Sequence, residues 1–365
     1  MWYTDFVTVF FYTLIFFLPL LVLPLGVSFF ETPKVILAEL LIELLVLLTL
    51  FKAKFNLKFL ITFPGFAVSI ILFLSIIDLI FLKTETTFFG NAFRLQGIFL
   101  LWHLLAFAFI SSRTELPKKA CLFSLFSLII LALSVYIFGG DINGRAFGTL
   151  GEANSLAGAA IFFLPFGLTT PKKWVKFSAL ILVFLIILAS GSRTGALGFL
   201  ILTIFFGLIY IFKLKLPHAF IVALFISIMS LFLPIYAGGG WYENRAEIWY
   251  TSLVAGATSP VLGHGFGNMQ SALHQTSLIL NNNIQYLVVD SAHNIFLDFW
   301  IQGGFLGVLA LGLLVIYSIR VFLKRNQTLE LMILLGLLIT LSFNPVSVSL
   351  LVGFWWVLGQ GFKKV

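Results

Sequence analysis

The sequence predicts an all-α membrane protein in which about twelve helices cross the bilayer. Hydrophobic residues make up 61% of the 365-residue chain and charged residues only 10%, whereas soluble domains carry about 25% charged residues. The mean hydropathy is +1.11, and long apolar runs alternate with short segments that contain charge, proline or glycine. These properties are typical of a multi-pass membrane protein.

Each apolar run has roughly the length of one membrane-spanning helix. In chain order, the expected spans are residues 6–25, 33–51, 60–82, 97–112, 119–138, 153–169, 174–190, 194–212, 217–236, 292–319, 329–343 and 345–361. Several are near the lower length limit, and a re-entrant or tilted helix remains an alternative for one or two of them. The first run has no basic segment before it and no small-residue cleavage site after it, so we expect it to be retained.

The basic residues predict the orientation, because Lys and Arg gather in the cytoplasmic loops of membrane proteins. Most of the 22 basic residues fall in every second gap. They are Lys52, Lys54, Lys58, Arg113, Lys118, Lys119, Lys172, Lys173, Lys176, Lys213, Lys215, Arg320, Lys324, Arg325, Lys363 and Lys364. We therefore expect both termini in the cytoplasm. The net charge of +8 reflects this bias and does not indicate nucleic-acid binding.

A smaller set of basic residues lies on the outer side of the predicted membrane. Its members are Lys34, Lys83, Arg94, Arg145, Arg193 and Arg245. The planar guanidinium group of arginine binds phosphate through two parallel hydrogen bonds. The arginines on this face therefore predict a site for a phosphorylated, lipid-linked molecule. The alternative for each arginine is structural, for example an ion pair of Arg193 or Arg245 with Glu243, Glu247 or Asp290.

The only long loop is the predicted extracytoplasmic segment 237–291, which separates residues 1–236 from residues 292–365. Loops of this length are usually functional or disordered. Asn244-Arg-Ala-Glu247 resembles a capping box at a helix start. Residues 245–255 then form an amphipathic pattern, which predicts a helix that lies along the membrane surface and ends at Thr258-Ser-Pro260.

The segment Asp290-Ser-Ala-His293-Asn294 begins the tenth expected span. Ser291 is a candidate N-cap, which would place His293 in the first helical turn at the outer surface. The positive end of the helix dipole disfavours the imidazolium ion there, so the ring stays neutral and can accept a proton. An interfacial histidine without a chemical role is the alternative.

The remaining ionisable residues give weaker signals. Glu39 and Glu43 lie inside the second expected span with no assigned role, whereas His103 and Asp78 are expected to satisfy buried partners. His264 and His274 are weak candidates in the long loop. Cys121 is the only cysteine and no metal or nucleotide motif is present, so we expect neither a metal nor a cofactor.

Two motifs stand at the ends of helices on the outer face. His293-Asn294 is followed after nine residues by Gly304 and after two more by Gly307. This spacing matches a family signature written H-[NSQ]-x9-G-x-x-G at the end of a long periplasmic loop. Ser192-Arg193-Thr194-Gly195 resembles a second element of the same family, S-R-[GT]-x.

Two further segments extend the likeness over roughly residues 90–310. Arg245, three residues, Trp249, and then Ser259-Pro-Val-Leu-Gly-His-Gly-Phe-Gly267 resemble R-x3-W followed by P-x-x-G-x-G-x-G. Gly148-Thr-Leu-Gly-Glu-Ala-Asn-Ser-Leu-Ala157 resembles G-x-x-x-N-x-N-x-x-A, with Glu152-Ala153 in place of the usual Asn-Pro. The chain therefore resembles the O-antigen ligase family of bacterial inner-membrane glycosyltransferases.

The resemblance implies a GT-C-like fold and transfer of a preassembled glycan from undecaprenyl diphosphate to an acceptor hydroxyl on the periplasmic face. Ligation of O-antigen to lipid A-core in lipopolysaccharide biosynthesis is the expected reaction, by a metal-independent inverting mechanism. We expect Arg193, Arg245 and Arg94 to bind the diphosphate and His293 to act as the general base. Supporting roles are expected for Arg145, Asn294, Asp290 and Glu247.

Three alternatives stay open. Repeat-unit polymerases and protein O-oligosaccharyltransferases of the same superfamily use the same kind of donor with a different acceptor. A transporter or flippase of polyprenyl-linked glycan would also bind the diphosphate through arginine. A transporter should carry repeat symmetry and broken helices at the membrane midplane, whereas this chain gathers its arginines at one face.

Overall fold

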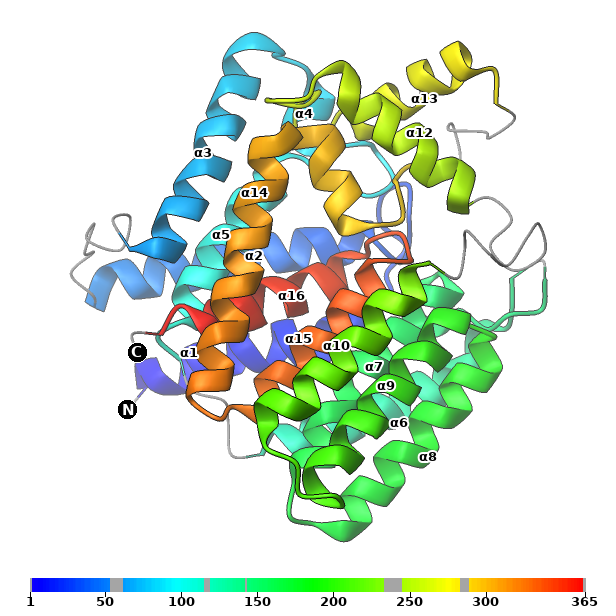
Figure 1. The fold of residues 1–365 in the computed structure, drawn as a ribbon. Coiled ribbons are helices and arrows are strands. Elements are labelled where there is room, and N and C mark those ends of the chain that lie inside the picture. The colour runs from blue at the N-terminus through cyan, green and yellow to red at the C-terminus, as the bar shows by residue number, and fades with distance from the viewer. Residues whose placement is uncertain are drawn as a thin grey trace.

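The computed structural model describes residues 2–52, 62–114, 119–141, 143–232, 245–282 and 289–363. The described residues form helices and no strands, which confirms the all-α class (Figure 1). Five helices are long and apolar enough to cross a membrane by themselves: Phe63–Phe81, Ala120–Phe138, Lys173–Ser190, Arg193–Tyr210 and Ile295–Arg325. With the shorter apolar helices, they make the chain a multi-pass membrane protein, and the number of twelve crossings stays a prediction.

The helices fall on the expected spans. They are α1 (Trp2–Tyr12), extended by η1 (Thr13–Phe17) and η2 (Leu18–Leu20), then α2 (Thr32–Lys52), α3 (Phe63–Phe81), α5 (Ile98–Ser111), α6 (Ala120–Phe138), α7 (Ala153–Thr169), α8 (Lys173–Ser190), α9 (Arg193–Tyr210), α10 (Leu216–Leu231), α14 (Ile295–Lys324), α15 (Thr328–Leu341) and α16 (Val348–Gly361). The short elements α4 (Glu85–Phe89) and η4 (Gly148–Leu150) lie in connections. Lys54, Lys58, Lys118, Lys364, Glu243 and Asn244 lie outside the described residues.

The long loop contains two helices, α12 (Arg245–Thr258) and α13 (Met269–Leu280). Helix α12 ends at Thr258, as the Thr-Ser-Pro segment predicts. It packs against the start of α14, where the Trp300 indole N–H donates to the Leu253 carbonyl at 3.1 Å. The loop is therefore helical where the structure describes it.

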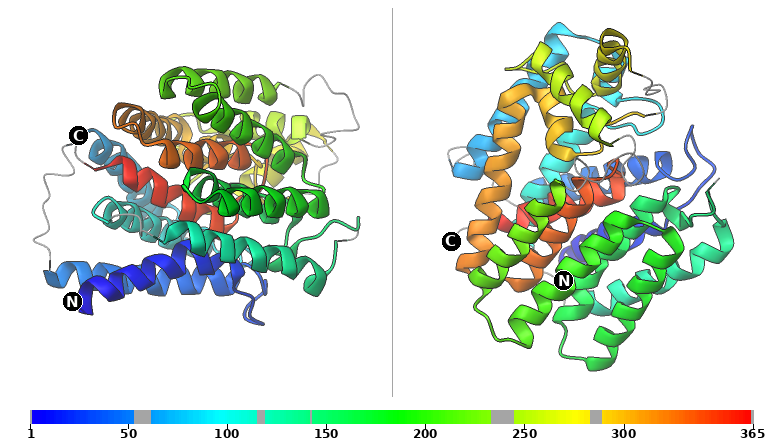
Figure 2. Two further views of the ribbon diagram at one scale, coloured as in Figure 1. Left: turned by 90° about the horizontal axis from the view of Figure 1, so that it is seen from below. Right: turned by 45° about the vertical axis from the view of Figure 1, so that its right-hand side comes forward.

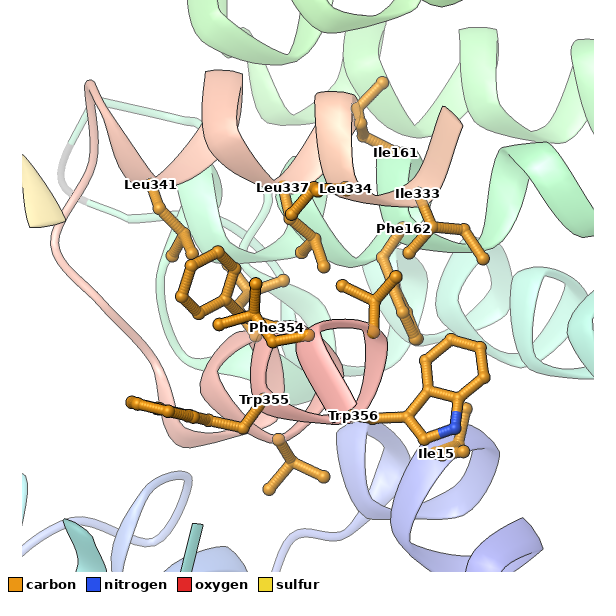
Figure 3. Packing of buried hydrophobic residues seen from close by; sticks show 14 of the residues in the cluster. Ile15, Ile161, Phe162, Ile333, Leu334, Leu337, Leu341, Phe354, Trp355 and Trp356 are labelled. Carbon is orange, nitrogen blue, oxygen red and sulfur yellow. The ribbon is translucent and has the colours of Figure 1, made fainter. Parts of the chain in front are cut away.

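The centre of the bundle is formed by α15 and α16, which are buried on nearly every side. Figure 3 shows Phe354, Trp355 and Trp356 of α16 among apolar side chains of α7 and α15. The Trp356 ring lies 6.4 Å from the ring of Phe162 in α7 and 6.1 Å from that of Phe166. A helix that is apolar all round is suited to such a central position.

The connections between helices gather at two opposite ends of the bundle. Figures 1 and 2 place the first and last described residues at the same end. At that end the Arg325 guanidinium donates to the Lys363 carbonyl at 3.3 Å, joining α14 to the end of α16. Helices α12 and α13 lie at the other end (Figure 1), so the long loop covers the side away from these basic residues.

Helix α14 is broken at Gly304, which has φ 59° and ψ −155°. A Cβ atom on Gly307 would lie only 3.0 Å from the Phe299 carbonyl oxygen. In a straight helix, residues 299 and 307 would be separated by about 12 Å along the axis. The chain therefore reverses, and residues 295–303 fold back beside residues 305–324 (Figure 1). The span expected at residues 292–319 is therefore interrupted at Gly304, because glycine in the left-handed region breaks an otherwise continuous apolar run.

The glycine-rich turn at residues 263–267 packs against this break. The His264 and Gly265 amides donate to the Ile301 and Gln302 carbonyls at 2.8 and 2.9 Å. A Cβ atom on Gly263 would overlap the Gln302 carbonyl group. The Phe266 amide donates at 2.9 Å to Asp78 of α3, which confirms the expected buried partner for this acid. The glycines thus allow two backbone segments to meet closely.

We expect Gly304→Ala to lower the free energy of unfolding by about 1–3 kcal/mol, because it places a side chain at positive φ. The added Cβ would also lie 2.5 Å from the Val261 carbonyl carbon. Gly312→Ala in the same helix is the matched control, since its Cβ meets nothing within 4 Å and alanine favours a helix. The unfolding midpoint in detergent measures both, and equal midpoints would contradict the assigned role of Gly304.

Candidate functional site

His293 lies just before α14 rather than inside its first turn. Its φ of 55° is left-handed and cannot continue into a helix. Asn294 is the N-cap, and its side-chain oxygen accepts from the Phe296 and Leu297 amides at 3.0 and 3.3 Å. The predicted N-cap, Ser291, instead accepts from the His293 amide at 3.2 Å. The predicted helix start is therefore wrong by three residues, because the Asn294 amide group caps it.

The His293 ring is largely enclosed. Its Nδ1 atom is buried and has no hydrogen-bond partner among the described residues. Burial lowers the pKa of His293 well below 6.5, and the positive charges of Arg245 and Arg94 lower it further. The imidazole is therefore neutral at neutral pH, as expected, although burial and two arginines outweigh the helix dipole as causes. In a neutral imidazole one of the two ring nitrogens keeps a free lone pair, which can accept a proton.

Arg94 stands beside this histidine in an ion pair. Its Nε atom donates to Asp290 Oδ2 at 2.5 Å, and its Nη1 atom donates to the Val346 carbonyl at 3.2 Å. Asp290 precedes His293 by three residues and is 8% exposed. An ion pair of this kind is the structural alternative to phosphate binding that the sequence allowed for the outer arginines. It also ties the connection between α3 and α5 to the start of α14.

Arg245 is the first residue of α12, and its charge acts on His293. Glu247 lies in the same first turn. One turn along, the Trp249 ring lies 5.8 Å from the ring of Phe343, which is in the connection between α15 and α16. The start of α12 therefore covers this connection, with its arginine directed to the histidine site.

Arg193 is the first residue of α9 and is exposed. Ser192 caps this helix by accepting from the Gly195 amide at 3.1 Å, and its hydroxyl donates to Asn154 Oδ1 at 3.0 Å. Arg145 donates to the same Asn154 oxygen at 2.9 Å and to the Ser190 carbonyl at 3.0 Å. Arg145 therefore has the structural role that was its alternative, and it holds the turn that carries Arg193.

Glu152, which stands where the family pattern has asparagine, takes part in the same network. Its carboxylate accepts from the Asn154 side-chain amide at 3.0 Å and from the Ser155 hydroxyl at 2.6 Å. These bonds fix the orientation of Asn154, and with it the contacts of Ser192 and Arg145. The turn at the start of α7 is thus rigid despite the replacement.

A series of contacts joins the two arginine regions at one end of the bundle. Val346 accepts from Arg94, and the Val348 amide two residues on donates to Glu31 at 3.0 Å. Lys34, three residues after Glu31, is fully buried and donates to the Thr149 carbonyl at 2.7 Å. Thr149 lies in the connection that contains Arg145. Lys34 is therefore a structural residue, and these connections share one end of the bundle.

The other histidines that the structure describes have contacts of a different kind. His264 Nε2 is within hydrogen-bond distance of the Ala255 carbonyl and the Thr258 hydroxyl, at 2.9 and 2.8 Å. This histidine closes the end of α12, which agrees with its weak candidacy. His103 Nε2 lies 3.2 Å from Glu43 Oε1 across α5 and α2, so His103 has a partner, but this partner is exposed rather than buried as expected.

A cavity of about 80 Å³ lies beside the Arg94–Asp290 pair. Its lining combines polar side chains, among them Gln270 and Gln302, with apolar residues such as Leu104 of α5 and Trp355 of α16. A lining with both characters suits a ligand that has a polar group and a hydrocarbon part. The cavity therefore lies beside the ion pair, between α5, the start of α14 and α16.

The connection between α15 and α16 was missed in the sequence. Its Ser342 carbonyl accepts from the Asn294 side chain at 3.2 Å, so it lies directly against the histidine site. The signal was Asn344-Pro345, a turn-forming pair between two apolar runs, with Ser347 and Ser349 close by. Because none of these residues is charged, the sequence indicated only a turn between two spans and no part of a site.

The comparisons with known proteins agree with the motifs. Residues 178–312 match the family model described as O-antigen ligase. This segment contains Arg193, Arg245, His293 and Gly304, and the match supports assigning the chain to that family. The comparison with curated proteins gave no match.

Proposed function

We propose that this chain, as a member of the O-antigen ligase family, is a glycosyltransferase that moves a preassembled glycan from undecaprenyl diphosphate to an acceptor hydroxyl. The observation that carries the proposal is the neutral His293 beside Arg245 and Arg94, whose buried Nδ1 atom has no hydrogen-bond partner among the described residues. A general base next to cations is the arrangement that glycosyl transfer from a diphosphate requires. We place the site on the periplasmic face of the inner membrane, since the basic loops predict cytoplasmic termini.

In this mechanism His293 takes the proton of the acceptor hydroxyl. The acceptor oxygen forms a bond to the anomeric carbon as the bond from that carbon to the diphosphate oxygen breaks. The departing undecaprenyl diphosphate keeps the electron pair, and Arg193 and Arg245 stabilise the charge that grows on it. A single displacement of this kind inverts the anomeric centre.

Lipid A-core is the acceptor that we propose first, because the histidine signature resembles that of the ligases. The test supplies purified protein in detergent with a glycosylated undecaprenyl diphosphate and offers lipid A-core, a second donor molecule and a peptide in parallel. Product on lipid A-core supports ligation, whereas product on the second donor or the peptide indicates a polymerase or a protein glycosyltransferase. A flippase would give no product, since detergent leaves no second compartment.

We expect transfer to continue at its full rate in excess EDTA. The diphosphate is already a good leaving group, and Arg193 and Arg245 supply positive charge in place of a metal ion. The rate is measured before and after chelation. A loss that Mg²⁺ or Mn²⁺ restores would contradict this mechanism and would indicate an ion bound near Glu247 or Asp290.

A further inference from the structure

The connection between α15 and α16 is buried, yet its polar side chains lack partners. Residues 342–349 are all buried, with Asn344 1% and Ser347 0% exposed. Both side-chain atoms of Asn344 and the hydroxyls of Ser347 and Ser349 have no hydrogen-bond partner among the described residues. Ser347 is the N-cap of α16, but its hydroxyl does not cap the helix. Buried polar groups are nearly always satisfied by protein, by ordered water or by a ligand, so this cluster is a candidate position for one of the last two.

This cluster belongs to the same place as the histidine site. The Trp249 indole nitrogen and His293 Nδ1 are also buried and unpartnered among the described residues. The Trp249 ring packs beside that of Phe343, and the Asn294 side chain donates to the Ser342 carbonyl. Since Asn294 directly follows His293, the connection lies against the segment that carries the proposed base.

The connection also lies within the depth of the membrane. Helices α15 and α16 have 14 residues each, so each is about 21 Å long, whereas the hydrocarbon core is about 30 Å thick. Both helices begin or end at the face where Arg325 meets Lys363, so the connection stops short of the opposite membrane surface. Non-helical backbone occurs at such depth only when it is buried in protein or lines a cavity.

The chemistry of the cluster favours a neutral, hydroxyl-rich ligand. Asn344 Oδ1 must accept a hydrogen bond, and an ionised phosphate has no donor to offer. Residues 342–349 include no charged side chain. A sugar hydroxyl can donate and accept, and the rings of Trp249 and Phe343 supply apolar surface for a pyranose face.

We propose that residues 342–349, which we name the α15–α16 recess, bind a sugar ring and hold it against His293. The inference deepens the proposed function, on which it rests. The sugar belongs either to the first residue of the donor glycan or to the acceptor. In both cases the recess determines which glycan the enzyme accepts, and the arginines bind the diphosphate independently of it.

The test replaces Asn344 by leucine, which has a similar volume and no polar atoms. We expect kcat/KM to fall about 10- to 100-fold, since each lost hydrogen bond to a substrate costs up to about tenfold. The unfolding midpoint should stay equal to that of the parent or rise, because the change removes unsatisfied buried groups. Thr340→Val is the matched control, because the Thr340 hydroxyl is buried but donates within α15 to the Gly336 carbonyl at 2.8 Å.

Binding measurements separate the sources of the sugar and the two proposals. Undecaprenyl diphosphate without glycan should bind the parent and Asn344→Leu equally. Weaker binding of the glycosylated donor alone assigns the recess to the donor sugar, and weaker binding of lipid A-core alone assigns it to the acceptor. Unchanged binding of the glycosylated donor and of lipid A-core would overturn the proposal that the recess binds a sugar. A lowered unfolding midpoint with unchanged kcat/KM would overturn it as well. A parent that binds these molecules but transfers no glycan would instead overturn the proposed function.

Discussion

Glycan transfer should fall on the order of 10²–10⁴-fold in a His293→Ala variant, the usual contribution of a general base. Binding of the donor should stay close to that of the parent, because in the proposed mechanism the arginines rather than His293 bind the diphosphate. The His293 Nδ1 atom has no described structural partner, so the loss should not come from unfolding. His274→Ala in α13 is the control and should cost far less. The measurements are the initial transfer rate and the donor dissociation constant.

The dependence of the rate on pH gives His293 a signature that a structural residue would lack. Burial, with Arg245 and Arg94, lowers its pKa well below 6.5, so the free enzyme should keep a neutral base through neutral pH. The value of kcat/KM should stay level there and fall only as the pH drops through the lowered pKa. A bound diphosphate adds negative charge and raises the pKa, so the fall in kcat should begin at higher pH. An unchanged acid limb in an active His293→Gln variant would remove His293 from the role of base.

Replacing Arg193 or Arg245 by alanine should abolish transfer while the protein still folds. Each stands at the first position of a helix, α9 or α12, at the end of the bundle that contains His293. The guanidinium group can bind the diphosphate through paired hydrogen bonds, and these strengthen as charge grows on the leaving oxygen. Lysine should rescue poorly, because it is a point charge without the planar arrangement of donors.

The arginine prediction is checked by transfer rate and donor affinity for the alanine and lysine variants, with the unfolding midpoint as the measure of folding. If both lysine variants kept nearly the activity of the parent, positive charge alone would matter and the paired-bond argument would be wrong. If donor affinity were unchanged in both alanine variants, another group would bind the diphosphate. Arg94 also acts on His293, and its bond to Asp290 would have to open before it could bind the diphosphate in this way.

The helices could be predicted from the sequence because a membrane span is a local property of composition. The runs at 119–138 and 174–190 coincide with α6 and α8 almost residue by residue. The reversal at Gly304 could not be predicted in this way, since hydropathy does not record chain direction. Gly304 sits inside an apolar run, and its meaning depends on close packing against Val261, more than forty residues earlier.

The charged residues of the candidate site could be predicted from the sequence. The roles that depend on contacts between residues distant in the sequence could not. The asymmetry of basic residues drew attention to Arg245 and Arg94, and the structure places both close enough to act on His293. That Arg145 has a structural role depends on Asn154 and Ser190, whose positions follow from the packing of α7 and α8. The unpartnered atoms of Asn344 are visible only once three-dimensional packing has buried them.

The reversal of α14 has a consequence for the lipid that surrounds the protein. A straight helix over all 30 residues of α14 would extend about 45 Å, roughly 15 Å more than the hydrocarbon core. Residues 305–324 alone match the core, so hydrophobic mismatch opposes straightening and favours the folded-back form. In a thicker bilayer the mismatch of the straightened helix is smaller, so straightening is opposed less strongly. The thickness of the membrane should therefore affect the fold-back of residues 295–303, and with it the position of His293 just before α14.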